Sequence, residues 1–234
     1  MERAHKSGFV NIIGHPNVGK STLTNALLGE RLNIITPKAQ TTRHRIFGIL
    51  NGESQDFDYQ LVFSDTPGVL EPAYALQDSM LSAVKSALED ADVFLYVVEL
   101  GEGSLKNESF LKALQDTDKP VILLLNKVDL HDQEKLEKET DLWIDRMPNA
   151  EIIPISALTK FNLDYVMKRL LDLTPVCKPY FGKEQLTDRS ERFVTSEIIR
   201  EQVLMNYNKE IPYSVEVGID TFVEDDDIIR IRAI

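Results

Sequence analysis

Short apolar runs alternate with amphipathic stretches over most of this 234-residue chain. The apolar runs are rich in β-branched residues and predict buried strands, and the stretches between them have apolar residues at helical spacing. The run VILLL is apolar at every position, which is typical of a strand covered on both faces. The predicted strands are Phe9–Ile13, Ile46–Leu50, Tyr59–Ser64, Val93–Val98, Val121–Leu125 and Ile152–Ile155. The predicted helices are Thr22–Gly29, Tyr74–Glu89, Leu105–Asp116, Gln133–Met147 and Asn162–Asp172.

This alternation predicts an α/β fold with a mostly parallel sheet flanked by helices. One connection departs from the pattern. The polar loop NGESQDFD, which joins Ile46–Leu50 to Tyr59–Ser64, has no room for a helix. We therefore expect these two strands to form an antiparallel hairpin at one edge of the sheet.

The α/β pattern stops near Thr174, which divides the chain into residues 1–174, a linker at 175–190 and a tail at 191–234. The linker has prolines and no periodicity. The tail predicts a helix over Glu191–Asn206, strands over Tyr213–Ile219 and Ile228–Ala233, and a solvated turn at EDDD between the strands. A tail of this size is too small to bury much core alone.

Composition restricts the class of protein. The chain is 43% apolar, enough for a packed core, and its net charge of −12 argues against a broad non-specific nucleic-acid surface. Its one cysteine, Cys177, cannot form an intramolecular disulfide, which suits a reducing cytosol. No signal peptide is evident, and no apolar run approaches membrane-spanning length.

The stretch GHPNVGKS lies between the first predicted strand and the first predicted helix, and it fits the phosphate-loop pattern G-x-x-x-x-G-K-[ST]. In such a loop, glycines let the backbone N–H groups turn towards phosphate oxygens, and the helix N-terminus adds positive charge. Lys20 can reach the terminal phosphates, and the Ser21 hydroxyl can bind Mg²⁺. A chance match is the alternative, and the strand–loop–helix setting argues against it. The predicted nucleotide contacts here are Gly14, His15, Pro16, Asn17, Val18, Gly19, Lys20, Ser21 and Thr22.

The sequence DTPG ends the strand Tyr59–Ser64. Asp65 can hold Mg²⁺ through water, and Gly68 can offer its N–H to a γ-phosphate, with Thr66 and Pro67 between them. Taken alone, the four residues are also ordinary turn chemistry.

NKVD and ISAL end the next two strands, where ligands bind in an open α/β sheet. The Asp129 carboxylate can accept hydrogen bonds from guanine N1 and N2, which adenine cannot supply. The motif also contains Asn126 and Lys127. The aliphatic part of the Lys127 side chain can lie along the base. The backbone N–H groups of Ser156 and Ala157 can donate to guanine O6. Leu158 follows them and is a further predicted nucleotide contact. A capped helix after a strand is the alternative for NKVD.

QTTR lies between the first helix and the second strand, where a threonine of a mobile loop can complete a Mg²⁺ shell. The order of these motifs and their places at strand ends resemble the GTPase superfamily across residues 9–173. The segments KAQTTRHRI, TDRSERF, SEIIRE and IPYSVEV narrow the resemblance to the Era family, bacterial-type ribosome-assembly GTPases with a C-terminal KH domain.

This resemblance implies a cytoplasmic, monomeric switch that binds GTP or GDP with Mg²⁺ and acts in small-subunit maturation. It implies binding to the 3′ region of small-subunit ribosomal RNA and loose association with the inner membrane. By match to the family motif, Thr42 rather than Thr41 is expected to join Ser21 and Asp65 at the metal. Lys20, Thr42 and Gly68 are expected to serve the chemical step, in which water attacks the γ-phosphorus.

Several positions qualify these expectations. Val69 follows DTPG where Ras-like enzymes carry a water-orienting glutamine, so we expect slow intrinsic hydrolysis. Asn17 matches the asparagine with which similar GTPases hold K⁺, although it can also merely shape the loop.

No GXXG clamp follows Glu191, and the tail has five basic residues against ten acidic ones. We therefore expect a partial KH domain that binds RNA weakly.

The sequence leaves two alternatives open. One is a GDP-locked or RNA-docking scaffold with negligible hydrolysis, which the valine at position 69 allows. The other is a different GTPase that shares the first domain, such as a tRNA-modifying or ribosome-assembly relative, and the tail motifs argue against it.

Overall fold

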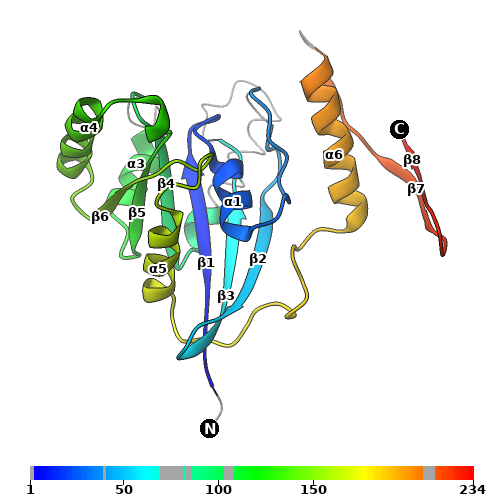
Figure 1. Ribbon diagram of the computed structural model, residues 1–234, viewed down its shortest axis with the longest axis horizontal. Helices are drawn as coiled ribbons and strands as arrows, with labels where there is room; N and C mark the ends of the chain where they lie inside the picture. Colours follow the sequence, from blue (N-terminus) through cyan, green and yellow to red (C-terminus); the bar gives the residue numbers. More distant parts are fainter. Residues whose placement is uncertain (1–2, 39–40, 69–81, 83–85, 103–107, 208–213) are drawn as a thin grey trace.

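A six-stranded sheet forms the centre of the computed structural model, which describes residues 3–38, 41–68, 82, 86–102, 108–207 and 214–234. The strand order is β2-β3-β1-β4-β5-β6 (Figure 1). All neighbours run parallel except β2, which pairs antiparallel with β3 at one edge. The predicted edge hairpin is therefore confirmed. The strands are β1 Ala4–Gly14, β2 Ile46–Glu53, β3 Phe57–Asp65, β4 Val93–Glu99, β5 Val121–Asn126 and β6 Ala150–Pro154.

Helices cover both faces of the sheet and divide its core in two. One core contains residues of α1 and α5, and the other contains residues of α3 and α4. Successive strand residues point to opposite faces, so Leu124 lies in the first core and Leu125 in the second. The all-apolar strand predicted from VILLL is confirmed for this reason. The helices are α1 Lys20–Leu28, α3 Glu108–Gln115, α4 Gln133–Arg146 and α5 Leu163–Leu173.

Two predicted helices fall partly outside the described residues. Most of Tyr74–Glu89 lies there, while residues 82 and 86–89 are helical. The predicted helix from Leu105 is described from Glu108 onward, as α3. Val69 also lies outside the described residues.

The tail contains α6 (Glu191–Asn206) and an antiparallel pair of strands, β7 (Ile219–Glu224) and β8 (Ile229–Ala233). The predicted helix is confirmed, and the Ser190 hydroxyl caps it by accepting from the Phe193 N–H at 3.3 Å. The predicted strand Tyr213–Ile219 is wrong, because its described residues 214–218 are not in a strand. A hairpin pairs the residues that directly flank its turn, so the strand lies next to the acidic turn instead.

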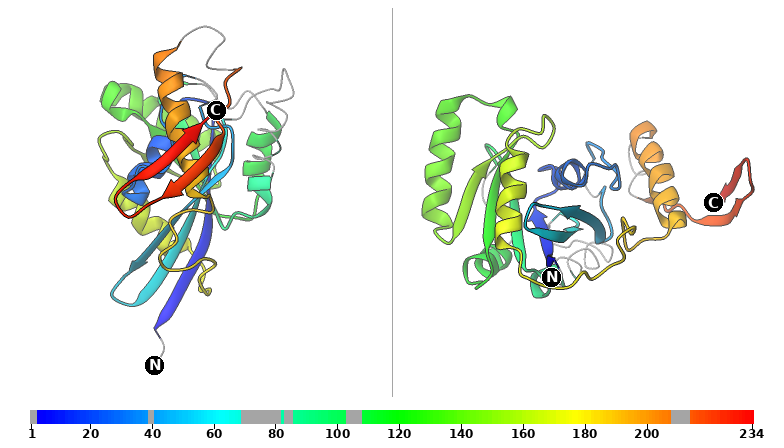
Figure 2. Two further views of the ribbon diagram at one scale, coloured as in Figure 1. Left: turned by 90° about the vertical axis from the view of Figure 1, so that its right-hand side faces the viewer. Right: turned by 60° about the horizontal axis from the view of Figure 1, so that its bottom comes forward.

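The predicted linker, residues 175–190, begins beside β1, where the Ser7 N–H donates to the Pro175 carbonyl, and then lies along the edge strand β2 and leads to α6 (Figure 1). The Ile49 N–H donates to the Leu186 carbonyl at 2.8 Å, and the Phe47 N–H donates to the Asp188 carboxylate at 3.0 Å. The segment thus covers backbone groups that an edge strand would otherwise expose. The view from below in Figure 2 shows α6 and the β7–β8 pair beyond this edge.

Gln60 of β3 fixes this segment from inside. Its side chain is fully buried, and its carbonyl accepts from the N–H groups of Tyr180 and Phe181 at 2.8 and 2.9 Å. Its amide group donates to the Phe181 carbonyl at 2.9 Å and to the Asn51 side chain at 2.8 Å. The hydrogen-bonding capacity of this amide is therefore used completely.

Replacing Gln60 with Leu is expected to lower the free energy of unfolding by about 2–4 kcal/mol, because three partly buried backbone groups of residues 180 and 181 lose their partner. Urea denaturation followed by circular dichroism measures this. Gln55 is exposed, so Gln55→Leu is the matched control. Equal unfolding midpoints for both variants would show that the Gln60 hydrogen bonds contribute no stability.

Candidate functional site

The loop from Gly14 to Ser21 joins β1 to α1, and both of its glycines are required by the structure. A Cβ at Gly14 would lie 2.3 Å from the Val97 carbonyl oxygen of β4. Gly19 has φ 100°, a left-handed conformation that a side chain disfavours. Gly19 also caps α1 without a side-chain hydrogen bond, so the first N–H groups of the helix can bind an anion.

Lys20 lies along this loop. Its Nζ donates to the carbonyls of Gly14 at 3.1 Å and His15 at 2.7 Å, and the side chain is almost completely buried. Burial lowers the pKa of the Lys20 ammonium to about 8, although the charges of Asp65 and Glu102 raise it. Both hydrogen-bond acceptors are neutral, so the positive charge can still attract phosphate oxygens.

Three oxygen-bearing side chains meet beside Lys20. The Ser21 hydroxyl donates to Asp65 Oδ2 at 2.7 Å and lies 3.0 Å from the Thr42 hydroxyl. Asp65 is fully buried at the end of β3, and its Oδ1 has no hydrogen-bond partner among the described residues. Burial raises the pKa of Asp65 to about 6, although the Ser21 hydrogen bond and the Lys20 charge both lower it. An unsatisfied carboxylate oxygen beside two hydroxyls fits a hard cation such as Mg²⁺.

The described residues contain no group of three His, Cys, Asp or Glu that could hold a metal. A metal at this place would therefore depend on hydroxyl and phosphate oxygens together with Asp65. Thr41 does not contribute, because its hydroxyl bonds to Thr36 Oγ1 at 2.6 Å and to the Lys38 carbonyl at 2.7 Å. The geometry thus favours Thr42 over Thr41.

Residues 66–68 pack against the loop. The Thr66 hydroxyl is buried and donates to the Ile12 carbonyl at 2.6 Å, so it holds the end of β3 to β1. Pro67 is buried as well. A Cβ at Gly68 would lie 2.5 Å from the Pro16 nitrogen, so this close approach requires glycine.

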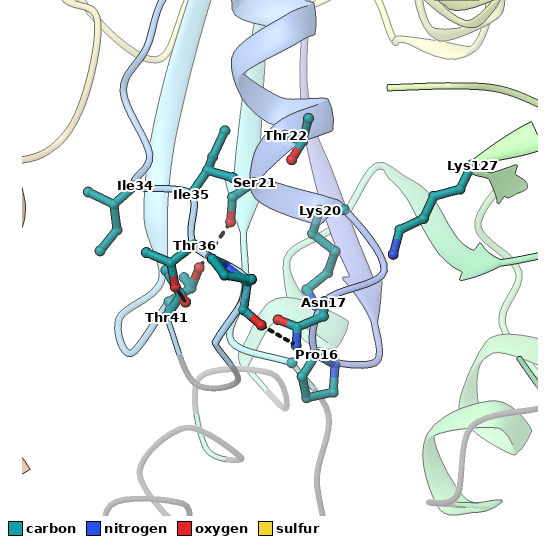
Figure 3. A pocket seen from close by; sticks show the side chains of 14 residues that line it. Pro16, Asn17, Lys20, Ser21, Thr22, Ile34, Ile35, Thr36, Thr41 and Lys127 are labelled. Carbon is teal, nitrogen blue, oxygen red and sulfur yellow. Dashed lines mark hydrogen bonds between the residues drawn. The ribbon is translucent and has the colours of Figure 1, made fainter. Parts of the chain in front are cut away.

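A cavity of about 410 Å³ opens over these groups, and Figure 3 shows Ser21, Thr36 and Thr41 on one side with Lys127 on the other. This volume is in the range of ligand sites. Residues 34–37 line the cavity but were not predicted, since no motif marks them. The lining residues are Pro16, Asn17, Gly19, Lys20, Ser21, Thr22, Ile34, Ile35, Thr36, Pro37, Thr41, Thr42, Gly68 and Lys127.

Asn126 connects two loops at the edge of this cavity. Its amide group donates to the Val18 carbonyl at 2.7 Å, and its side-chain oxygen accepts from the Ala157 N–H at 2.9 Å. The Ser156 N–H donates to the Phe161 carbonyl at 3.3 Å. Both N–H groups offered to guanine O6 by the sequence thus have partners within the chain, which the motif alone could not reveal.

Lys127 and Asp129 follow β5 at the same edge. Lys127 has φ 65°, and its Nζ pairs with the Glu99 carboxylate at 2.5 Å. Asp129, in the short 3-10 helix Val128–Leu130, is exposed, so its carboxylate is accessible to a ligand. Leu158 is 78% exposed and therefore also accessible.

Two loop residues have neighbours that the motif does not indicate. His15 Nδ1 lies 2.9 Å from the Glu102 carboxylate, which links the loop to the segment after β4. Asn17 is exposed with φ 64°, and its amide group donates to the Pro37 carbonyl at 3.2 Å. Asn17 therefore already shapes the cavity wall, and its role with K⁺ stays a prediction.

Comparisons with known proteins identify related GTPases. The family described as 50S ribosome-binding GTPase matches residues 9–127. The chain is 42% identical to GTPase Era of Syntrophus aciditrophicus, covering 97% of this chain and 74% of that protein. It is 40% identical to GTPase Era of Clostridium perfringens, covering 94% and 74%.

Two solved structures are similar over nearly the whole chain. One is Era in complex with MgGDPNP and nucleotides 1506–1542 of 16S ribosomal RNA, with a TM-score of 0.90, 36% identity and coverage of 98% of this chain and 78% of that one. The other is a variant of Aquifex aeolicus Era bound to GDP and AlF4⁻, with a TM-score of 0.90, 37% identity and coverage of 97% and 78%.

Proposed function

This chain belongs to the Era family of GTPases, and on that premise we propose that the cavity beside Lys20 binds GTP together with Mg²⁺. The observation that carries the proposal is the cluster of Ser21, Asp65 and Thr42 oxygens next to a buried ammonium group. A triphosphate requires both a positively charged side chain and a Mg²⁺ site beside its phosphates, and Lys20 and the oxygen cluster would provide them.

Different residues of the cavity would hold the metal ion and the phosphates. Ser21, Thr42 and Asp65 would hold Mg²⁺, which when bound neutralises charge on the β- and γ-phosphates. Lys20 and the N–H groups at the start of α1 would bind the phosphates, since they form a preorganised positive surface. Gly68 lies against Pro16 of the loop and would offer its N–H to the γ-phosphate. Water then attacks the γ-phosphorus, and GDP leaves.

Asp129 would select guanine, because its exposed carboxylate can accept from both N1 and N2 of that base. Asn126 would act by holding the phosphate loop to the Ala157 loop, as its two hydrogen bonds indicate. Lys127 lines the cavity and would lie along the base.

The solved Era complex with 16S ribosomal RNA supports a role in small-subunit maturation and binding to its 3′ region. We propose this role for the chain as a GTP-dependent switch, and the scaffold without hydrolysis is not favoured, since the relatives are GTPases. Among the described residues, no helix is long and apolar enough to cross a membrane. Cytoplasmic location, peripheral membrane association, a monomeric state and the use of K⁺ stay predictions.

Substituting Thr42 with Val is expected to lower the single-turnover rate of GTP hydrolysis by about 10–100-fold, because one oxygen of the metal cluster is lost. Thr41→Val is the matched control and should have a much smaller effect, since the Thr41 hydroxyl bonds to Thr36 and Lys38 instead. Phosphate release measures both rates. Equal losses in the two variants, or no GTP turnover by the unaltered chain, would contradict the proposal.

A further inference from the structure

Helix α6 carries three charged side chains that are almost completely buried. Glu197, Arg200 and Glu201 are 8%, 3% and 3% exposed. They lie against the segment that joins α1 to β2, beside which α6 stands in Figure 1. Buried charges are costly unless they are paired and hydrogen-bonded, so these three indicate a specific contact rather than general packing.

Arg200 holds the backbone immediately before Thr42. Its Nη2 donates to the Thr41 carbonyl at 2.6 Å. Glu197, one turn earlier in α6, orients the guanidinium by accepting from Arg200 Nε at 2.7 Å and Nη2 at 2.5 Å. Such a two-point pair fixes the direction of the donor as well as its position.

Glu201 holds a second point of the same segment. Its Oε1 accepts from the Ile35 N–H at 2.9 Å, and the Arg31 guanidinium donates to both of its oxygens at 2.8 Å. Ile35 and Thr41 both line the cavity. Helix α6 therefore contacts the cavity wall at two backbone positions, on either side of residues 36–40.

We propose that Arg200 and Glu201 are positioning residues that hold the Thr42 hydroxyl beside Ser21, ready for Mg²⁺. Neither residue lines the cavity, and both act through the backbone of its wall, at the Thr41 carbonyl and the Ile35 N–H. This inference rests on the proposed function, because it assumes that the cavity binds a nucleotide together with Mg²⁺. By linkage, a nucleotide that needs Thr42 at the metal also favours the docked position of α6.

The test separates nucleotide binding from its enhancement by Mg²⁺. The affinity for a fluorescent, non-hydrolysable GTP analogue is measured in excess EDTA and again in excess Mg²⁺, for the unaltered chain and for Arg200→Met. Loss of a charged hydrogen bond should reduce the Mg²⁺-dependent gain in affinity about tenfold, while the affinity in EDTA stays unchanged. Arg192→Met, an equal change at an exposed position of α6, should alter neither value.

Glu201 gives an independent test with a conservative variant. Glu201→Leu removes the acceptor of the Ile35 N–H and should also reduce the Mg²⁺-dependent gain. Glu201→Gln keeps a carbonyl oxygen for that N–H and should restore most of the gain. A merely structural role would not distinguish Mg²⁺-dependent from Mg²⁺-independent binding.

Hydrogen exchange provides the reciprocal readout. Binding of the analogue with Mg²⁺ should increase the protection of α6 amides in the unaltered chain, and Arg200→Met should abolish that increase. If the unaltered chain shows a Mg²⁺-dependent gain but Arg200→Met and Glu201→Leu retain it fully, the positioning role is overturned and the proposed function stands. If the unaltered chain shows no such gain, both are overturned.

Discussion

Replacing Asp129 with Asn is expected to lower the affinity for GTP by about 10²–10⁴-fold, since one of the two hydrogen bonds from guanine to the carboxylate would be lost and a donor would face a donor in its place. An Asn amide would meet the N2 amino group of guanine with a donor of its own. Xanthine carries an oxygen at that position, so the same variant should gain affinity for xanthosine triphosphate.

Competition between the two nucleotides for a fluorescent analogue measures this change of preference. Asp141→Asn, an equal change at an exposed position of α4, is the control and should keep the preference for GTP. If Asp129→Asn still prefers GTP with unchanged affinity, Asp129 does not read the base. The NKVD sequence would then be only a strand followed by a helix.

Replacing Lys20 with Met is expected to lower the rate of GTP hydrolysis by about 10²–10³-fold, the usual cost of removing one preorganised donor from a charged transition state. The buried ammonium is supported by the Gly14 and His15 carbonyls, so it is already oriented before a ligand arrives. Met has a similar length and no charge, so it should fill the same space.

Single-turnover hydrolysis and nucleotide affinity should both fall in this variant, because Lys20 would contact the phosphates in the ground state as well. The control is Lys138→Met on α4, where Lys138 pairs with Glu134 on the surface. A thermal unfolding midpoint near that of the unaltered chain would exclude loss of the fold. Unchanged turnover with Lys20→Met would remove Lys20 from the chemical step.

Local pattern was sufficient for most of the fold, because strand and helix periodicity depends on neighbours in sequence. The all-apolar run Val121–Leu125 indicated two covered faces, and the structure has a core on each side of it. The predicted strand Tyr213–Ile219 was wrong because an alternation of apolar and polar residues does not determine which segment a strand pairs with. The pairing of β7 with β8 across the acidic turn decided which residues form the strand.

The candidate site shows the same division. The positions of Gly14, Lys20 and Asp65 could be predicted because a phosphate loop and a strand-end carboxylate are short, local signals. The partners of Asn126 could not be predicted, since Val18 and Ala157 are distant in sequence. For the same reason, no motif identified residues 34–37 as part of the cavity wall.

The sequence by itself determined the fold class, the family resemblance and the chemical types at the site, since all of these are written in local spacing and residue identity. Only the tertiary structure decided how the tail meets the cavity. Residues 175–190 and α6 contain no recognisable ligand motif, yet Gln60 anchors the former and Arg200 links the latter to the Thr41 carbonyl. Such contacts join residues more than a hundred positions apart, and folding alone brings them within hydrogen-bonding distance.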